Sequence, residues 1–178
     1  MTYRVGISGY GLSGRYFHAP VLVGAGFEVV GILTRNEERA AQARSDFPGA
    51  TIAGSMSQLL SLDLDLLVIA SANIVHAEEA IAGLRAGVPV VVDKPMGRTL
   101  EETEKIIAVS DETGTAVSTY FNRLFDSDAL TVKKAISEGV IGNIFRLDSR
   151  FERFRPAANP QSWREVSSAA EGGGNLLD

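Results

Sequence analysis

The feature that most constrains this chain is the spacing of three glycines close to its beginning. Gly9, Gly11 and Gly14 follow the apolar run 4–8 and open a stretch that reads as helix. A strand, a glycine turn and a helix are the setting in which the spacing G-x-G-x-x-G binds a dinucleotide. The first glycine permits the tight turn, the second lets the backbone approach a pyrophosphate, and the third lets helix and strand pack closely. The pattern alone is a weak signal, because ordinary glycine-rich turns also join strands to helices.

The sequence that follows alternates β-rich apolar runs with helical stretches up to about residue 119. This alternation predicts an α/β fold, a doubly wound parallel sheet of the Rossmann type with helices on both faces. The runs 66–69 and 88–92 are continuously apolar, as central parallel strands are. We expect a dinucleotide-binding domain over residues 1–119. Its strands are expected at 3–8, 27–34, 50–53, 64–70, 88–93 and 115–120.

Capping residues mark the expected helix boundaries. Asn36 stands where its side chain can cap a helix that begins at the next residue. Thr99 and Glu102 have the spacing of a capping box. Gly87 and Gly114 stand where glycine commonly ends a helix. Local signals and the hydrophobic pattern therefore predict the same elements.

The sequence after residue 119 has a different pattern. A helix is expected over 126–138 with Gly139 at its end, and alternation over 144–154 predicts one long strand. Because a single strand needs partners to bury its apolar face, residues 120–178 read as the incomplete first part of an α+β open-sheet domain. We therefore expect the chain to be a piece of a longer protein that forms homo-oligomers through this sheet.

Composition excludes several classes of function. The 178 residues carry a net charge of −5 and no basic run, which argues against a nucleic-acid partner. No stretch approaches the roughly 20 apolar residues of a membrane span. Strand-like sequence from Tyr3 onward leaves no room for a signal peptide. The absence of cysteine rules out disulfides and thiolate chemistry and suits the cytoplasm, and we expect no metal site.

Several short motifs occur along the whole chain in one order, and in that order they resemble the Gfo/Idh/MocA oxidoreductases. This family includes inositol dehydrogenases and glucose–fructose oxidoreductase. The run Phe17–Pro20 is similar to a subgroup that includes NADP-linked inositol-type dehydrogenases. The motifs are the glycine turn 9–14, Ser71–His76, Ala86–Pro95, Asn122–Arg123, Glu138–Gly142, Trp163–Arg164 and Gly172–Gly174.

The resemblance implies an oxidoreductase that transfers a hydride between NAD(P) and a secondary alcohol or ketone of a sugar, inositol or related polyol. The alternative is a catalytically incomplete dinucleotide-binding module, such as a redox sensor. A Gly-x-His continuation just after Asp178 would favour the enzyme, and an immediate stop codon would favour the module. A semialdehyde dehydrogenase is a weaker alternative, because the chain lacks the cysteine nucleophile that this chemistry requires.

Lys94 is the first candidate catalytic residue. It stands at the end of the fifth expected strand, the edge where open α/β sheets bind ligands, and Pro95 biases it to extended backbone. A lysine ammonium there can donate a hydrogen bond to a substrate hydroxyl and stabilise the oxygen as charge develops. The alternative is an ordinary solvated lysine. The family usually has glutamate where this chain has Asp93, which leaves the support of the lysine open.

The resemblance places the family's base in the helix after the glycine-rich stretch, as a histidine four positions beyond an aspartate. Asp178 matches that aspartate and is the second candidate catalytic residue, supporting a histidine beyond the last residue. His76 is placed near the nicotinamide, with a local cap at the helix start as the equal alternative. His18 lies either beside the dinucleotide or in the helix–sheet packing.

The end of the second expected strand indicates which dinucleotide is bound. An acidic residue there binds the ribose 2′-OH and repels a 2′-phosphate. This chain has Thr34 and Arg35, which suit a phosphate, so we expect NADP to be preferred or both NADP and NAD to be used. The alternative is an arginine that points to solvent. In total the resemblance assigns cofactor binding to Gly9, Gly11, Leu12, Ser13, Gly14, Thr34, Arg35, Ser71, Asn73, His76, Asp93, Lys94, Asn122, Arg123, Trp163 and Arg164.

Overall fold

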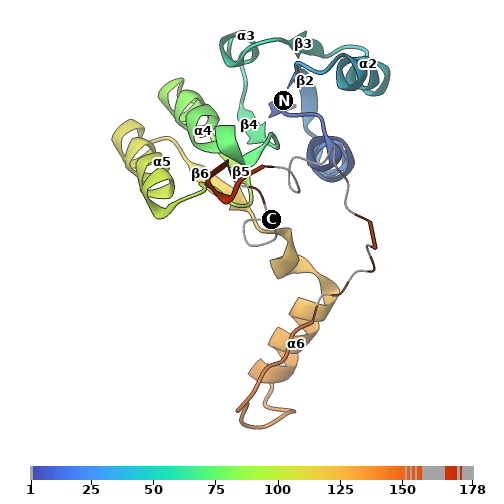
Figure 1. The fold of residues 1–178 in the computed structure, drawn as a ribbon, viewed down its shortest axis with the longest axis vertical. Coiled ribbons are helices and arrows are strands. Elements are labelled where there is room, and N and C mark those ends of the chain that lie inside the picture. The colour runs from blue at the N-terminus through green and yellow to red at the C-terminus, as the bar shows by residue number, and fades with distance from the viewer. Residues whose placement is uncertain are drawn as a thin grey trace.

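The computed structural model describes residues 2–150, 152, 154, 156–157, 167–171 and 173. A six-stranded sheet organises this part of the chain, with every neighbouring pair parallel and the order β3-β2-β1-β4-β5-β6 (Figure 1). This order confirms the doubly wound α/β prediction, because the chain builds outward from β1 in one direction and from β4 in the other. The strands are β1 (Arg4–Ser8), β2 (Glu28–Leu33), β3 (Thr51–Ala53), β4 (Leu66–Ile69), β5 (Val90–Asp93) and β6 (Val117–Tyr120).

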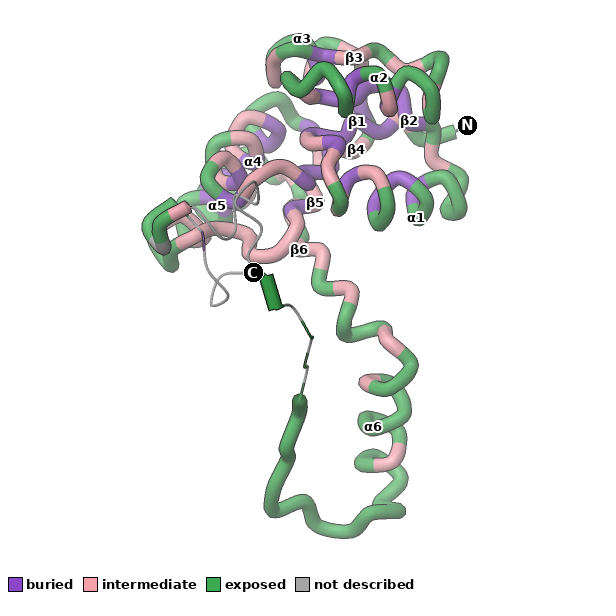
Figure 2. The backbone as a smooth tube through the Cα atoms, turned by 45° about the vertical axis from the view of Figure 1, so that its right-hand side comes forward, coloured by how far each residue is buried: buried purple, intermediate pink, exposed green. Residues whose placement is uncertain are grey.

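Helices cover both faces of the sheet, as its continuously apolar strands require (Figure 2). One face packs against α1 (Ala19–Gly24) and α2 (Glu37–Asp46). The other packs against α3 (Met56–Leu60), α4 (His76–Arg85) and α5 (Leu100–Thr113). The remaining helical segments are η1 (Gly14–His18), η2 (Asn73–Val75), η3 (Asn122–Phe125), α6 (Ser127–Ser137) and η4 (Ala169–Glu171). None of the helices in the described ranges has the length and apolar character needed to span a membrane.

The alternation of side chains along each strand builds two apolar layers, one on each face. In β5, Val90 and Val92 join the layer beneath α4 and α5, and each is at most 2% exposed. Burial of a branched apolar side chain to this extent contributes roughly 1.5–3 kcal/mol. Because successive side chains of a strand point to opposite faces, Asp93 is directed toward the α1 face. This direction decides which residues its carboxylate meets.

The predicted caps are confirmed with one difference. The Asn36 side chain accepts a 2.9 Å hydrogen bond from the backbone N–H three residues later, and Thr99 Oγ1 accepts one of 3.2 Å from Glu102 N. The Glu102 carboxylate, however, accepts from Arg98 N at 2.7 Å, one residue before the position that a capping box requires. Its other partner is the Arg98 guanidinium, and that ion pair holds the carboxylate in place. The two glycines predicted to end helices both have positive φ.

The chain leaves the sheet after β6, and here one prediction is wrong. The helix expected over 126–138 forms as α6, which extends away from the sheet (Figures 1 and 2). The long strand predicted over 144–154 does not form in its described stretch 144–150, which contains no strand. Its apolar side chains are exposed, 97% for Phe145 and 77% for Leu147. A strand exists through hydrogen bonds to a neighbour, and the described part of the chain places no other strand beside it.

Candidate functional site

The candidate site lies at the carboxyl ends of β1 and β4. The strands that follow β1 are added on one side of it and the strands from β4 onward on the other, so the strand order reverses between these two neighbours. These strands are neighbours, with Ser8 paired to Ile69 at their ends. Open α/β sheets bind ligands in the crevice at such a switch point. The glycine turn follows β1, and the segment 71–76 follows β4. The structure therefore brings two of the predicted motifs together at one crevice.

The glycine turn has the close contacts that only glycine allows. Gly9 has a φ of +89°, and a Cβ there would lie 2.6 Å from the Ala70 carbonyl oxygen. A Cβ on Gly14 would lie 2.0 Å from the Gly9 carbonyl oxygen. At Gly11 the nearest atom to a Cβ would be the Arg39 guanidinium carbon at 3.5 Å, so the outer side of the turn meets no backbone. The turn is tight, has no side chains at its glycines, and continues into a helix, whose first backbone N–H groups have no partner within the helix. This arrangement fits a pyrophosphate.

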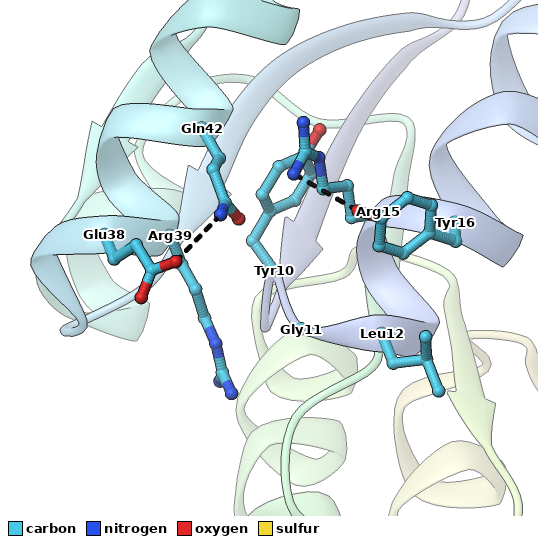
Figure 3. A pocket seen from close by; sticks show the side chains of 8 residues that line it. All are labelled: Tyr10, Gly11, Leu12, Arg15, Tyr16, Glu38, Arg39 and Gln42. Carbon is cyan, nitrogen blue, oxygen red and sulfur yellow. Dashed lines mark hydrogen bonds between the residues drawn. The ribbon is translucent and has the colours of Figure 1, made fainter.

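A pocket of about 310 Å³ opens beside this turn (Figure 3). It lies between the glycine turn and η1 on one side and α2 on the other. The Arg39 guanidinium extends from α2 toward Gly11, whereas Gln42 donates a 3.3 Å hydrogen bond to Glu38 (Figure 3). Dinucleotide-binding domains place the ribose next to the end of the second strand, and α2 follows that strand directly. The lining residues are Tyr10, Gly11, Leu12, Arg15, Tyr16, Glu38, Arg39 and Gln42.

The two arginines of this pocket differ in their partners. Arg15 donates to both carboxylate oxygens of Asp46, at 2.7 and 3.2 Å, and the Tyr10 hydroxyl donates to the same group at 2.9 Å. The Arg15 guanidinium holds the pKa of Asp46 below its usual range, while burial and the Asp46 charge raise the pKa of Tyr10. Within the described residues the Arg39 guanidinium has neither an ion pair nor a hydrogen bond. Arg39 is therefore the cation available to an anionic ligand.

Sequence reasoning missed Arg39 and selected the residues at the strand end. Thr34 is half-buried directly after β2, and its Oγ1 accepts a 3.4 Å hydrogen bond from Asn36 N. Arg35 is exposed at the same end of the sheet. The signal for Arg39 was available, because the Asn36 cap starts α2 and places Arg39 in its first turn. A search that included this first turn would have found it.

A half-buried carboxylate links the ends of the two central strands. Glu79 of α4 accepts hydrogen bonds from Ser8 Oγ at 2.8 Å and from Ser71 Oγ at 2.7 Å. Burial raises the pKa of Glu79, and the two hydroxyl donors offset only part of that effect. Ser71 thus lies in the crevice as predicted, but its hydroxyl binds Glu79. No sequence signal pointed to this link.

His76 connects two segments at the same carboxyl edge of the sheet. Its side chain begins α4, is 1% exposed, and lies between two carbonyl oxygens. Nδ1 is 2.8 Å from Pro95 O, and Nε2 is 3.1 Å from Ser71 O. Both neighbours only accept hydrogen bonds, so the ring nitrogen that carries a proton is the donor. Neither contact is a capping bond to a helix N–H; they join the start of α4 to the segments after β4 and β5. A contact of His76 with the nicotinamide stays a prediction.

Lys94 lies directly after β5 and is half-buried at the carboxyl edge of the sheet. The peptide bond between Lys94 and Pro95 is cis. Asp93 accepts a 2.9 Å hydrogen bond from the Lys94 backbone N–H through Oδ1 and one from the Ser13 hydroxyl through Oδ2. The glycine turn and the end of β5 are therefore bonded directly. The structure places Lys94 and the turn at one edge of the sheet.

The remaining predicted residues divide into placed ones and ones outside the described residues. Asn73 is buried in η2, and Leu12 is exposed beside the glycine turn. Asn122 and Arg123 follow β6 at the same edge, and Arg123 donates a 2.8 Å hydrogen bond to Asp126. Among the residues that the structure describes, no cluster of metal-ligating side chains accompanies them. The residues outside the described ranges are Trp163, Arg164 and Asp178.

The described residues near the end of the chain, 167–171 and 173, return to this edge. Arg98, in the loop after β5, donates a 2.7 Å hydrogen bond to the carbonyl oxygen of Ala170 in η4. A Cβ on Gly173 would lie 2.1 Å from the Ser167 carbonyl oxygen, so the backbone folds tightly there. Residues 167–171, against which Gly173 folds, are thus bonded to the loop that follows β5.

Comparison with known proteins agrees with this geometry. The family model described as "Oxidoreductase family, NAD-binding Rossmann fold" matches residues 3–121. The chain is 35% identical over 184 residues to scyllo-inositol 2-dehydrogenase (NADP(+)) IolW of Bacillus subtilis, covering 99% of this chain and 50% of that protein. It is also 35% identical over 170 residues to the uncharacterized oxidoreductase YdgJ of Escherichia coli, covering 95% and 48%.

A solved structure extends the similarity to the whole fold. The NAD-binding protein from Listeria innocua superposes with a TM-score of 0.88 at 33% identity, covering 100% of this chain and 51% of that chain. The chain spans about half the length of the curated relatives it matches. The range 3–121 that the family model matches contains the glycine turn and all the strands of the sheet.

Proposed function

Because the chain belongs to the Gfo/Idh/MocA oxidoreductase family and has its NAD-binding Rossmann domain over residues 3–121, we propose that it serves as an NAD(P)-dependent oxidoreductase. Its proposed substrate is a secondary alcohol or ketone of a sugar, inositol or related polyol. The observation that carries the proposal is that Lys94 and the glycine turn share one edge of the sheet and are linked by the Ser13–Asp93 hydrogen bond. The relative named as a scyllo-inositol 2-dehydrogenase supports the polyol class.

The proposed mechanism assigns separate tasks to the residues at this edge. A bound nicotinamide would supply the acceptor or donor of the hydride. The glycine turn would bind the phosphates through bare backbone N–H groups. The Lys94 ammonium would donate a hydrogen bond to the substrate oxygen and stabilise negative charge that develops on it. The hydroxyl proton needs an acceptor, and we assign Asp178 the role of supporting the histidine that takes it.

We further propose that NADP is the preferred cofactor. The Arg39 guanidinium, which has no ion pair among the described residues, lies beside the glycine turn, and Arg35 is exposed after β2. Thr34 stands where an acidic residue would bind the ribose hydroxyls of NAD, so no carboxylate repels a 2′-phosphate from that position. Arginine binds phosphate through paired charge-assisted hydrogen bonds. The name of the relative IolW, which includes NADP(+), agrees with this preference.

The proposal gives the two parts of the chain different roles. Residues 1–119 would bind the cofactor, and residues 120–178 would begin the domain that completes the substrate pocket and joins copies into a homo-oligomer. The support is the exposed apolar surface after β6, where Val140 is 68% and Phe145 97% exposed. Exposed apolar surface of this kind marks contact regions in proteins.

A turnover assay tests the proposed function. The full-length protein, with the histidine proposed beyond Asp178, is mixed with NADP+ or NAD+ and with scyllo-inositol, myo-inositol or simple sugars, and the absorbance of the reduced nicotinamide is followed. Lys94→Ala is expected to leave the Kd for NADP+ within a few-fold and to lower turnover by about 100-fold, because it removes a contact to the developing oxyanion. The absence of turnover with every polyol would contradict the activity. A Lys94→Ala variant with normal turnover would contradict the role of the lysine.

A further inference from the structure

A second buried histidine lies on the opposite face of β5 from α4, and the proposed function does not use it. His18 is the last residue of the π-helical segment η1, and its side chain is 3% exposed. Its Nε2 lies 3.6 Å from Asp93 Oδ2 and has no hydrogen-bond partner among the described residues. The imidazole ring packs on Tyr120, with 4.2 Å between the ring centroids. A buried polar nitrogen without a closer partner needs an explanation.

The topology of the sheet explains why these groups meet. Asp93 is paired with Tyr120 across β5 and β6, so both side chains lie on the α1 face. The preceding Val92 points to the other face. On the α1 face, the residues directly before α1 form the π-helical segment η1 instead of regular α-helix. π-Helical segments occur frequently at functional sites. Two strand ends and η1 thus converge on the Asp93 carboxylate.

The Asp93 carboxylate is held from three directions. Oδ2 accepts from the Ser13 hydroxyl and faces His18 Nε2, while Oδ1 accepts from the Lys94 backbone N–H at 2.9 Å. Burial alone would raise the pKa of Asp93, but the nearby His18 ring, the Ser13 hydroxyl and the Lys94 backbone N–H outweigh burial and lower it. The ionised carboxylate is therefore the favoured form. Its orientation fixes the backbone at the residue that carries the proposed catalytic amine.

We propose that His18 and Ser13 are positioning residues for Lys94 that act through the Asp93 carboxylate. His18 directs Nε2 at Oδ2 from 3.6 Å and Ser13 donates a hydrogen bond to it, and together they keep Oδ1 on the Lys94 N–H. Because Ser13 belongs to the glycine turn, the same carboxylate couples the cofactor-binding turn to the position of Lys94. The inference rests on the proposed function only in taking Lys94 as the group that meets the substrate.

Two substitutions of His18 separate this polar role from simple packing. His18→Phe keeps an aromatic ring against Tyr120 but has no N–H, whereas His18→Gln keeps an N–H donor but loses the ring. A positioning role through Asp93 is damaged by phenylalanine and restored by glutamine. A packing role has the opposite pattern. Ser13→Ala removes the second donor and gives an independent check if a change at the buried His18 position impairs folding.

The first readout reports on Lys94 without any enzyme activity. The chain has four lysines, so [15N]lysine labelling gives four backbone amide signals, and Lys94→Arg identifies the signal of interest by its loss. Asp93→Asn sets the reference displacement of that signal. We expect His18→Phe and Ser13→Ala to move the Lys94 amide signal in the direction in which Asp93→Asn moves it, and His18→Gln to move it less. The signals of the other three lysines should stay in place. A Lys94 signal that moves as far in His18→Gln as in His18→Phe, or that is unchanged in His18→Phe and Ser13→Ala, would overturn the inference.

The second readout is the split between kcat and KM, measured on the full-length protein with NADP+ and scyllo-inositol. We expect His18→Phe to lower kcat by up to about 100-fold, as misplacement of a catalytic group does, and to leave KM for NADP+ within a few-fold of the wild-type value. In His18→Gln, kcat should recover. Equal losses in both variants would overturn the inference. A wild-type protein without turnover would count against the proposed function, and the lysine spectrum would then decide the inference alone.

Discussion

At the scale of single residues, the site is defined by which charged groups have partners. Arg15 is bound to Asp46, and Glu79 accepts from two serine hydroxyls, so neither is available to a ligand. Arg39 has no such partner in the described residues and lies beside Gly11. This contrast assigns the recognition of an anion in the pocket to Arg39.

Arg39→Ala is predicted to weaken binding of NADPH by about 10- to 100-fold and to leave binding of NADH nearly unchanged. The reason is the loss of hydrogen bonds to a charged phosphate, worth about 1.5–3 kcal/mol. Fluorescence titration of the reduced nicotinamide measures both affinities. Arg35→Ala is the matched control, and its effect on NADPH should be smaller. An equal loss for NADPH and NADH in Arg39→Ala would remove the 2′-phosphate assignment.

The Asp93 carboxylate is predicted to make stability depend on pH in the acid range. Its folded-state pKa is lowered, so ionised Asp93 stabilises the fold above the ordinary value of about 3.9. That contribution is lost as the pH falls through the lower folded-state pKa. The free energy of unfolding of the wild type should therefore exceed that of Asp93→Asn at pH 6, and the difference should shrink below about pH 4. Urea unfolding of both proteins from pH 3 to 7 checks this, and a constant difference would contradict it.

At the scale of elements, the strands and caps of the sheet were predictable because each has a local cause. Apolar, β-rich runs predicted every strand, and the side chains of Asn36 and Thr99 cap the helices for which they were proposed. The place of Lys94 followed from the rule that strand ends carry ligands. The links from Ser13 to Asp93 and from Ser71 to Glu79 were not predictable, because they join residues whose proximity arises only from packing.

The glycine turn is predicted to tolerate no side chain at its third glycine. Gly14→Ala would place a Cβ 2.0 Å from a backbone oxygen, so the turn must shift, at a cost of at least about 1–3 kcal/mol and with loss of dinucleotide binding. Gly24→Ala is the control in the helix that follows, because a Cβ there meets nothing within 4 Å. It should be neutral or stabilise by about 0.4–1 kcal/mol. Thermal unfolding measures both, and equal effects would contradict the account of the turn.

At the scale of the whole molecule, the parts before and after β6 differ in how far sequence could predict them. The Rossmann part buries its apolar residues within its own layers. The segment over 144–150 has the alternation of a strand but no partner strand in the described chain, so pattern alone gave the wrong structure. Helix α6 has a local capping and periodic signal and was predicted correctly.

Self-association is predicted to depend on the exposed apolar residues after α6. Phe145→Asp should lower the molar mass measured by light scattering after size-exclusion chromatography, because it places a charge where an apolar contact is proposed. Leu100→Asp is the control, since Leu100 is 73% exposed but starts α5 on the Rossmann part. A monomeric wild type, or an equal effect of both substitutions, would contradict association through this region.

The measurement that tests the central claim most directly is calorimetric titration of this 178-residue chain with NADPH and with NADH. The claim is that the carboxyl edge of the sheet, with its glycine turn and Arg39, binds NADP(H) in preference to NAD(H). The predicted result is one site per chain with NADPH bound at least about 10-fold more tightly than NADH, the equivalent of one charge-assisted contact. Failure to bind either dinucleotide, or tighter binding of NADH, would contradict it.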